Sequence, residues 1–228
     1  MAAGERTNRE HIPAKSYFPK AIRKQFNPEL DCLQVHESCN TALKLDEEYF
    51  LAAFGPAAGS DALVGRALLD DLRTAYRDDP NRRRLGEMVL REFGVVQAID
   101  GSRVKYYDAG RANVVLWKIV RGLAFLETQG SLLLRADAPK SVIICPTPES
   151  IETHGRPILD EFVQLPAMGK HRRVLDYRVH SVVEFAAGRL EMAGQAWALL
   201  LWNRIIAFVM FHVPVCPCSM CDPRRQVL

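Results

Sequence analysis

The sequence lacks the features that mark most specialised classes of protein. Lys and Arg (30) nearly balance Asp and Glu (27), and a net charge of +3 is too small to indicate a nucleic-acid-binding domain by itself. It shows no glycine-rich phosphate loop, no Ser–His–Asp pattern, no internal repeat and no low-complexity segment. Its 228 residues, 48% of them apolar and 25% charged, have the balance of an ordinary globular protein.

The sequence also shows neither the pattern of a secretory signal nor that of a membrane-spanning segment. The polar segment 1–9 lacks the apolar core of a signal peptide. The apolar run 196–213 holds Asn203 and Arg204 at its centre, where a bilayer-buried Arg costs roughly 2.5 kcal/mol or more. We therefore expect a cytoplasmic protein with no membrane partner. The run is interpreted as two buried strands, 197–202 and 205–213, that meet at a turn on Asn203-Arg204.

The cysteines are clustered rather than spread as in a disulfide scaffold. The six of them are Cys32 and Cys39, then Cys145 alone, then Cys216, Cys218 and Cys221. Such clusters favour metal binding or plain thiols in a reducing cytosol. For the C-terminal three, metal ligands and free thiols of a tail are both open, whereas Cys145 is most simply a thiol of the core.

The order of the expected elements indicates an α+β protein. Prolines interrupt the first 36 residues, so no long helix fits before Glu37. Hydrophobic spacing and turn residues then predict the remaining elements. These are a helix ending before Gly55-Pro56, helices over 60–92 with a break at 78–81, a hairpin over 95–107, a helix over 112–128, strands over 132–134, 142–145 and 174–185, and the apolar hairpin.

The residues that can carry chemistry lie within the first fifty. Glu10-His11 places a carboxylate beside an imidazole, and because neighbouring side chains of a strand point to opposite faces, a bend or a metal is needed to join them. Hydrolysis of a phosphodiester needs a histidine that takes a proton from water and a divalent ion. Glu10 and Asn40 offer oxygen ligands for Mg²⁺ or Mn²⁺. Asp31 is either a further ligand or holds the loop that carries His11.

A second metal motif follows. His36-x₂-Cys39 has the spacing of a zinc knuckle, with both ligands on one turn before a helix. A structural zinc ion needs four ligands, and Cys32 is a candidate for the third. No Cys-x₂-Cys pair lies upstream, where such a pair normally sits.

These segments resemble the HNH endonucleases, whose fold is a ββα-metal module, and more narrowly a bacterial group with REHxPPK, CxxCN and DEEYF segments. The resemblance is carried by Arg9–Pro19, His36–Asn40 and Asp46–Phe50, and Lys118–Phe125 is similar to a KIVRGLYF helix of the same group. The resemblance implies that His11 is the general base, that Glu10 and Asn40 bind the catalytic ion, and that His36 and Cys39 form half of a structural zinc site. Asp31 stands near the position of the middle asparagine of the HNH name.

The missing cysteine pair leaves two main explanations open. Either the true start of the protein lies further upstream, or the module has lost its zinc and is degenerate. A third, weaker explanation is that Cys216, Cys218 and Cys221 supply the missing zinc ligands.

The prediction is therefore an N-terminal ββα-metal (HNH-like) module over 1–55, followed over 56–228 by a helical region and a C-terminal α/β portion with an antiparallel hairpin. The predicted function is a metal-dependent HNH-type endonuclease that hydrolyses DNA phosphodiester bonds. Predicted contacts to DNA are Lys15, Lys20, Arg23 and Lys24, which follow His11 in the chain. The alternative is a non-catalytic module that binds nucleic acid or protein on a degenerate HNH fold.

Overall fold

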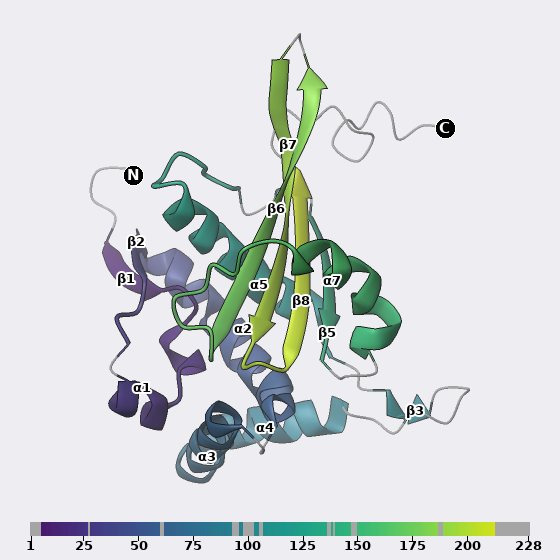
Figure 1. Ribbon diagram of the computed structural model, residues 1–228. Helices are drawn as coiled ribbons and strands as arrows, with labels where there is room; N and C mark the ends of the chain where they lie inside the picture. Colours follow the sequence, from purple (N-terminus) through teal and green to yellow (C-terminus); the bar gives the residue numbers. More distant parts are fainter. Residues whose placement is uncertain are drawn as a thin grey trace, which may run out of the picture. The chain divides into compact units, whose positions relative to one another are not determined.

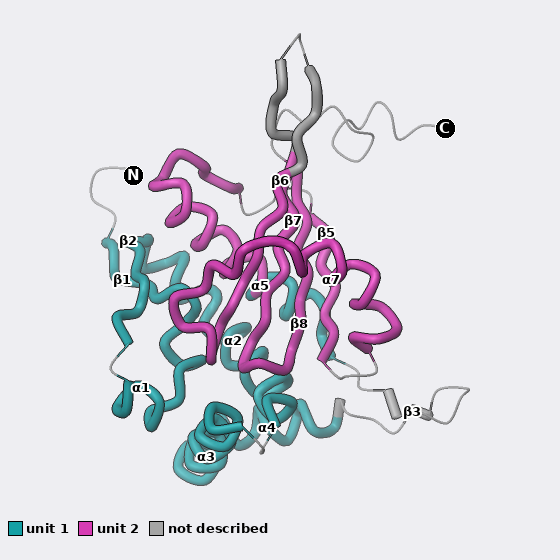
Figure 2. Tube along the Cα trace, in the orientation of Figure 1, with its two compact units in different colours: residues 1–115 teal, residues 116–228 magenta. Residues whose placement is uncertain are grey.

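The computed structural model describes residues 6–26, 28–59, 62–92, 96–97, 103–104, 107–135, 138, 140–146, 150–186 and 189–212 (Figure 1). The chain forms two compact units, residues 1–115 and 116–228 (Figure 2). The boundary between them follows Val115, whereas the sequence places the end of a module at residue 55. Whether residues 1–55 fold by themselves stays a prediction.

The first unit begins with the predicted ββα element. Strand β1 (Thr7–His11) pairs antiparallel with β2 (Cys32–His36), in a register that runs from Thr7↔His36 to His11↔Cys32. The 3₁₀ turn η1 (Lys15–Tyr17) and helix α1 (Lys20–Phe26) lie between the two strands in the chain, and helix α2 (Glu37–Phe54) follows β2 directly. We call the β1–β2 pair the ribbon.

Helix α2 changes character along its length. Its first turn is polar and exposed, whereas Tyr49, Phe50 and Phe54 near its end are fully buried. The ring of Phe50 lies 4.6 Å from that of Phe54 and stacks on that of Tyr17 at 5.7 Å between centroids. The helix ends at Phe54, before Gly55-Pro56, as the sequence predicts, because a proline has no N–H to continue the helical bonding.

The remaining helices of this unit also follow the sequence pattern. The 3₁₀ turn η2 (Gly55–Ala58) leads to α3 (Leu63–Asp78), and α4 (Pro80–Glu92) starts after the predicted break. At that break, Oδ1 of Asp79 accepts the backbone N–H of Asn81 at 2.9 Å, and Pro80 opens the helix. Short strands β3 (Val96–Gln97) and β4 (Arg103–Val104) pair antiparallel as predicted, and the turn between them lies outside the described residues.

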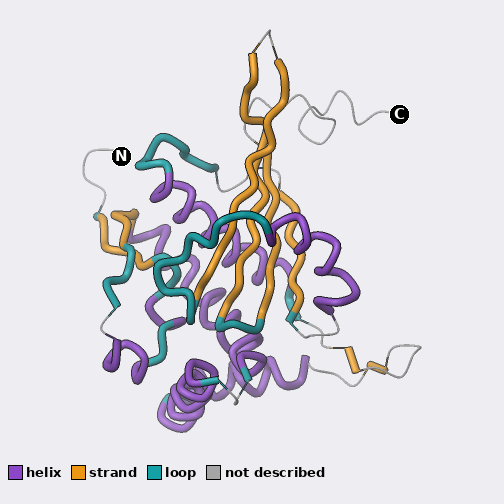
Figure 3. The backbone as a smooth tube through the Cα atoms, viewed as in Figure 1, coloured by secondary structure: helices purple, strands orange, loops and turns teal. Residues whose placement is uncertain are grey.

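Helix α5 (Ala109–Glu127) starts in the first unit and ends in the second, which contains an antiparallel sheet of order β5-β8-β7-β6 (Figure 3). Its strands are β5 (Lys140–Cys145), β6 (Leu175–Ala186), β7 (Arg189–Leu201) and β8 (Ile205–His212). Trp117 of α5 meets Phe211 of β8 edge-on at 5.3 Å. The π-helical turn η3 (Ile151–Gly155) and helix α7 (Arg156–Val163) cover the other face, where Phe162 lies 6.0 Å from Phe208.

Two expectations for this unit are wrong in detail. The segment 132–134 is not a strand: the carbonyl oxygens of Leu134 and Arg135 accept bonds from the side chains of Arg121 and Trp117 on α5, at 2.8 and 3.2 Å. The first strand of the hairpin ends at Leu201 rather than Trp202, so the turn on Asn203-Arg204 also takes in Trp202, and Trp202 and Asn203 both have positive φ. The pairing of the buried residues Leu201 and Ile205 fixes this register.

The combination of an N-terminal ββα element, a helical region and a C-terminal α/β portion with an antiparallel hairpin confirms the predicted fold class. Among the described residues, none of the helices combines the length and the apolar character needed to cross a bilayer.

Candidate functional site

The two faces of the ribbon carry different chemistry. Alternation along β1 puts Asn8 and Glu10 on one face and Arg9 and His11 on the other. The first face is turned to α2, because Nδ2 of Asn40 donates a hydrogen bond to Oδ1 of Asn8 at 3.2 Å. His11 therefore lies on the face away from α2.

That second face forms one wall of a pocket of about 460 Å³. The loop before β2 also lines the pocket and is joined to the end of β1 by a 2.9 Å hydrogen bond from the N–H of Ile12 to the carbonyl of Asp31. Residues of η1 and α1 complete the pocket. Its lining consists of Arg9, His11, Lys15, Arg23, Pro28, Glu29, Leu30 and Cys32.

The pocket is strongly cationic around a weakly basic imidazole. Three side chains of its lining, Arg9, Lys15 and Arg23, carry positive charge, against the single carboxylate of Glu29. Burial, and then the charge of Lys15, lowers the pKa of His11 below its usual value, with smaller contributions from Arg9 and Arg23, while Glu10 opposes the shift. The lowered pKa favours the neutral imidazole, which is the form that can accept a proton.

Cys32 is the direct partner of His11. Its Sγ lies 3.0 Å from Nδ1 of His11, across the ribbon, and also donates a hydrogen bond to the carbonyl oxygen of Leu30 at 3.3 Å. The spacing of Cys32 from His36 along the chain had predicted a zinc ligand instead. The pairing of residue 11 with residue 32 depends on the register of the ribbon, which no local motif reveals.

The predicted catalytic metal ligands do not join His11 in one pocket. Glu10 is buried, with 7% of its surface exposed, on the face turned to α2, and Asn40 bonds to Asn8 on the same side. Adjacent strand residues point to opposite faces, and neither Glu10 nor Asn40 is in the pocket lining, so the gathering of positions 10, 11 and 40 around one ion stays a prediction. The donor chemistry on the α2 side, one carboxylate with amide oxygens, still fits Mg²⁺, which keeps several waters when bound by few protein ligands.

The described residues do not complete a zinc site. Nδ1 of His36 lies 4.0 Å from Sγ of Cys39 at the start of α2. Cys32 begins the strand that His36 ends, roughly 13 Å away at 3.3 Å per strand residue, so it cannot share an ion with that pair. Within the described part of the chain, no three His, Cys, Asp or Glu side chains gather as metal ligands. Cys216, Cys218 and Cys221 lie outside it, and zinc stays a prediction.

The predicted DNA contacts divide into two groups. Lys15 and Arg23 line the pocket, and Nε of Arg23 donates to the carbonyl of Phe18 at 2.9 Å, which fixes its guanidinium. Lys20 and Lys24 are exposed and do not line it, and the backbone N–H of Lys20 donates to Asp71 of α3. Arg9, which also lines the pocket, was not among the predicted DNA contacts. Its place two residues before His11 on one strand was the signal that could have found it.

Asp31, the other predicted ligand, holds the loop by its backbone. Its carbonyl oxygen accepts the N–H of Ile12, the residue after His11, as noted above. The second of the two roles predicted for Asp31, holding the loop beside His11, matches this backbone bond. Its carboxylate stays a predicted ligand only.

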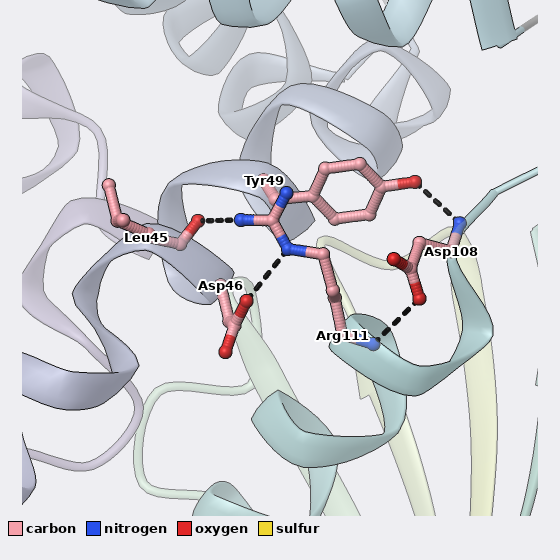
Figure 4. A network of polar contacts seen from close by, with 5 residues as sticks. All are labelled: Leu45, Asp46, Tyr49, Asp108 and Arg111. Atoms are coloured by element: carbon pink, nitrogen blue, oxygen red, sulfur yellow. Dashed lines mark hydrogen bonds and ion pairs between the residues drawn. The ribbon is translucent and has the colours of Figure 1, made fainter.

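The Asp46–Phe50 block has a structural task within the first unit (Figure 4). The guanidinium of Arg111 lies 4.3 Å over the ring of Tyr49 and donates to Oδ1 of Asp46 and the carbonyl of Leu45, both at 2.7 Å. The hydroxyl of Tyr49 accepts the N–H of Asp108 at 2.6 Å. This clasp ties α2 to the first turn of α5 and leaves the pocket as the candidate site.

Comparison of the chain with models of known protein families, with curated proteins and with solved structures gave no match.

Proposed function

We propose that the pocket binds a phosphodiester group of DNA and that the protein hydrolyses it with the help of a divalent cation. The observation that carries the proposal is the position of His11, a half-buried imidazole among three cationic side chains at the end of the first strand of a ββα element. A phosphate of a nucleic-acid backbone supplies the negative charge that such a lining favours.

The cationic side chains position the substrate. Arg23, already held by the carbonyl of Phe18, presents a fixed guanidinium, and guanidinium groups bind phosphate oxygens in a defined geometry. Arg9 and Lys15 add charge on either side of His11. Glu29, the one carboxylate of the lining, opposes a second phosphate and limits how much anionic charge the pocket holds.

His11 acts on water. A water molecule gives one proton to Nε2 of His11, and its oxygen forms a bond to phosphorus. The bond from phosphorus to one ester oxygen breaks, and that oxygen takes a proton from solvent. The lowered pKa of His11 supports this role, because an imidazole that is already protonated accepts no proton.

Glu10 and Asn40 are the residues proposed to hold the cation, on the α2 side of the ribbon. Mg²⁺ or Mn²⁺ held by them would supply stabilisation of the charge that develops on the leaving oxygen, which requires the DNA backbone to reach the α2 side of the ribbon as well as the pocket.

Cleavage of supercoiled plasmid tests the proposal. The purified full chain should convert plasmid to nicked or linear DNA with Mg²⁺ or Mn²⁺ and lose this activity in EDTA. The variant His11→Ala should be inactive. The matched control is His154→Ala, which removes an exposed histidine of η3 in the second unit and should leave cleavage unchanged. Equal cleavage by His11→Ala and the wild type would refute the assignment of the base.

The separation of His11 from Glu10 and Asn40 favours a second candidate, a module that binds DNA without cutting it. That protein would bind DNA through Arg9, Lys15 and Arg23, with or without Mg²⁺. Binding that needs Lys15, together with no cleavage under any divalent ion, would select it over hydrolysis.

A further inference from the structure

We infer that Cys32 is a positioning residue that holds His11 in the tautomer with hydrogen on Nδ1, leaving the lone pair of Nε2 to act on water. The inference rests on the proposed function only for its effect on turnover. The tautomer itself is a property of the described ribbon and can be measured in a protein that cuts nothing.

The tautomer follows from the number of hydrogens that Cys32 can share. The thiol of Cys32 has one hydrogen and two neighbours, the carbonyl oxygen of Leu30 at 3.3 Å and Nδ1 of His11 at 3.0 Å. A carbonyl oxygen only accepts, so the contact with Leu30 uses the thiol hydrogen. The contact with His11 is then a hydrogen bond only if Nδ1 carries the hydrogen and the sulfur accepts it.

Each of the two other placements of the hydrogens leaves one of these contacts without a hydrogen bond. If the thiol donated to Nδ1, the carbonyl of Leu30 would face a sulfur lone pair. If the pair were a thiolate with an imidazolium, the sulfur would have no hydrogen for Leu30 and its negative charge would lie against a carbonyl oxygen. Only the Nδ1–H tautomer of His11 turns both contacts into hydrogen bonds.

The backbone holds all three groups in place. His11 and Cys32 are directly opposite in the antiparallel ladder, where side chains of one face lie about 5 Å apart at Cβ. Leu30 precedes Asp31, whose carbonyl accepts the N–H of Ile12. The acceptor of the thiol hydrogen is thus anchored to the same strand end that carries the imidazole.

The consequence for the proposed reaction is a prepared base. An imidazole in water favours hydrogen on Nε2, the tautomer that cannot take a proton at that nitrogen. In the pocket, Nδ1–H of His11 points to Cys32, and Nε2 lies on the opposite edge of a ring that lines the cavity. A partner that fixes a tautomer in this way commonly contributes 10- to 100-fold to activity.

Nitrogen-15 NMR of the histidine rings at pH 8 measures the tautomer directly. The His11 signals are identified by their loss in His11→Gln. In the wild type, Nε2 should show the shift of an unprotonated nitrogen and Nδ1 that of a protonated one. Cys32→Ala should move His11 towards the Nε2–H form, whereas Cys32→Ser, whose hydroxyl can donate to Leu30 and accept from Nδ1, should keep the wild-type pattern. Cys145→Ala removes a thiol of the second unit, outside the pocket, and should not move the His11 signals.

A wild-type His11 with hydrogen on Nε2 would overturn the inference, and so would an unchanged tautomer in Cys32→Ala. Turnover separates the two proposals. Cys32→Ala should lower kcat about 10- to 100-fold with little change in KM, and Cys32→Ser should restore most of it. Cleavage that persists in His11→Ala would refute the proposed function while the NMR result still decides the tautomer. Equal kcat for Cys32→Ala in a protein that needs His11 would refute only the role of Cys32.

Discussion

The ribbon and the β7–β8 hairpin are both antiparallel pairs, yet they bury opposite kinds of side chain. In β8, Ile205, Phe208 and Val209 are fully buried, and the pair contributes to an apolar core on both faces of its sheet. In β1, the one buried side chain is that of Glu10. The β7–β8 hairpin is thus accounted for by packing, whereas the ribbon is not.

The difference shows where function is to be sought. Burial of a carboxylate and of part of an imidazole costs free energy that apolar residues in the same places would not cost. Glu10 and His11 occupy the two faces of one short strand, and each has polar neighbours there. Such groups in a strand with little apolar burial of its own are expected at a site of chemistry.

The largest effect that the comparison predicts is on stability. Phe208→Ala should lower the free energy of unfolding by about 3–5 kcal/mol, because it empties a fully buried position between β8 and α7. His11→Ala should lower it by about 1 kcal/mol or less, and Val163→Ala, at an exposed position, by about 0.5 kcal/mol or less. Urea unfolding measures all three. A larger decrease in the free energy of unfolding for His11→Ala than for Phe208→Ala would contradict this contrast between the ribbon and the β7–β8 hairpin.

The next largest effect is expected from removing the clasp, the contacts by which Arg111 holds α2. Arg111→Ala should destabilise the protein by about 1–2 kcal/mol, since it removes two hydrogen bonds and the stacking on Tyr49 from a half-buried side chain. Arg73→Ala, whose exposed ion pair with Asp70 is also an Arg–Asp contact, should cost about 0.5 kcal/mol or less. Equal losses of stability in thermal unfolding would show that the contacts of Arg111 with Asp46, Leu45 and Tyr49 do not stabilise the fold.

The smallest predicted effect is on the salt dependence of DNA binding, and it distinguishes residues that line the pocket from residues outside it. Lys15→Gln should weaken DNA binding and reduce the slope of log K against log salt by about 1, the change expected for one lost phosphate contact. Lys24→Gln removes an equal charge from a residue outside the pocket and should leave the slope unchanged. Fluorescence anisotropy with a labelled duplex at several salt concentrations measures both. Similar slopes for the two variants would place DNA outside the pocket.

The sequence predicted what depends on local chemistry. The end of α2 at Phe54 and the break before α4 were found because Pro56 and Pro80 cannot donate the next helical bond. The ββα order was predicted from the motifs of the first fifty residues, and the structure starts the helix at Glu37, inside the His36–Cys39 spacing. Each of these features needs only a few neighbouring residues to specify it.

The arrangement of the site was beyond such signals. The His11–Cys32 pair joins residues 21 positions apart, and its register is set by the length of the connection through α1 and by the Ile12–Asp31 bond. The spacing of Cys32 from His36 suggested zinc, although a strand holds those two residues apart. The same alternation divides Glu10 from His11, which the sequence placed in one pocket.

The most direct test of the central claim, that His11 in the cationic pocket is the base of a phosphodiesterase, is the single-turnover cleavage rate at saturating DNA and Mg²⁺. Conversion of His11 to Ala should lower this rate by about 10²- to 10⁴-fold, the usual contribution of a general base, while the affinity for uncleaved DNA changes less than about twofold. A His11→Ala protein that cleaves at the wild-type rate would contradict the account.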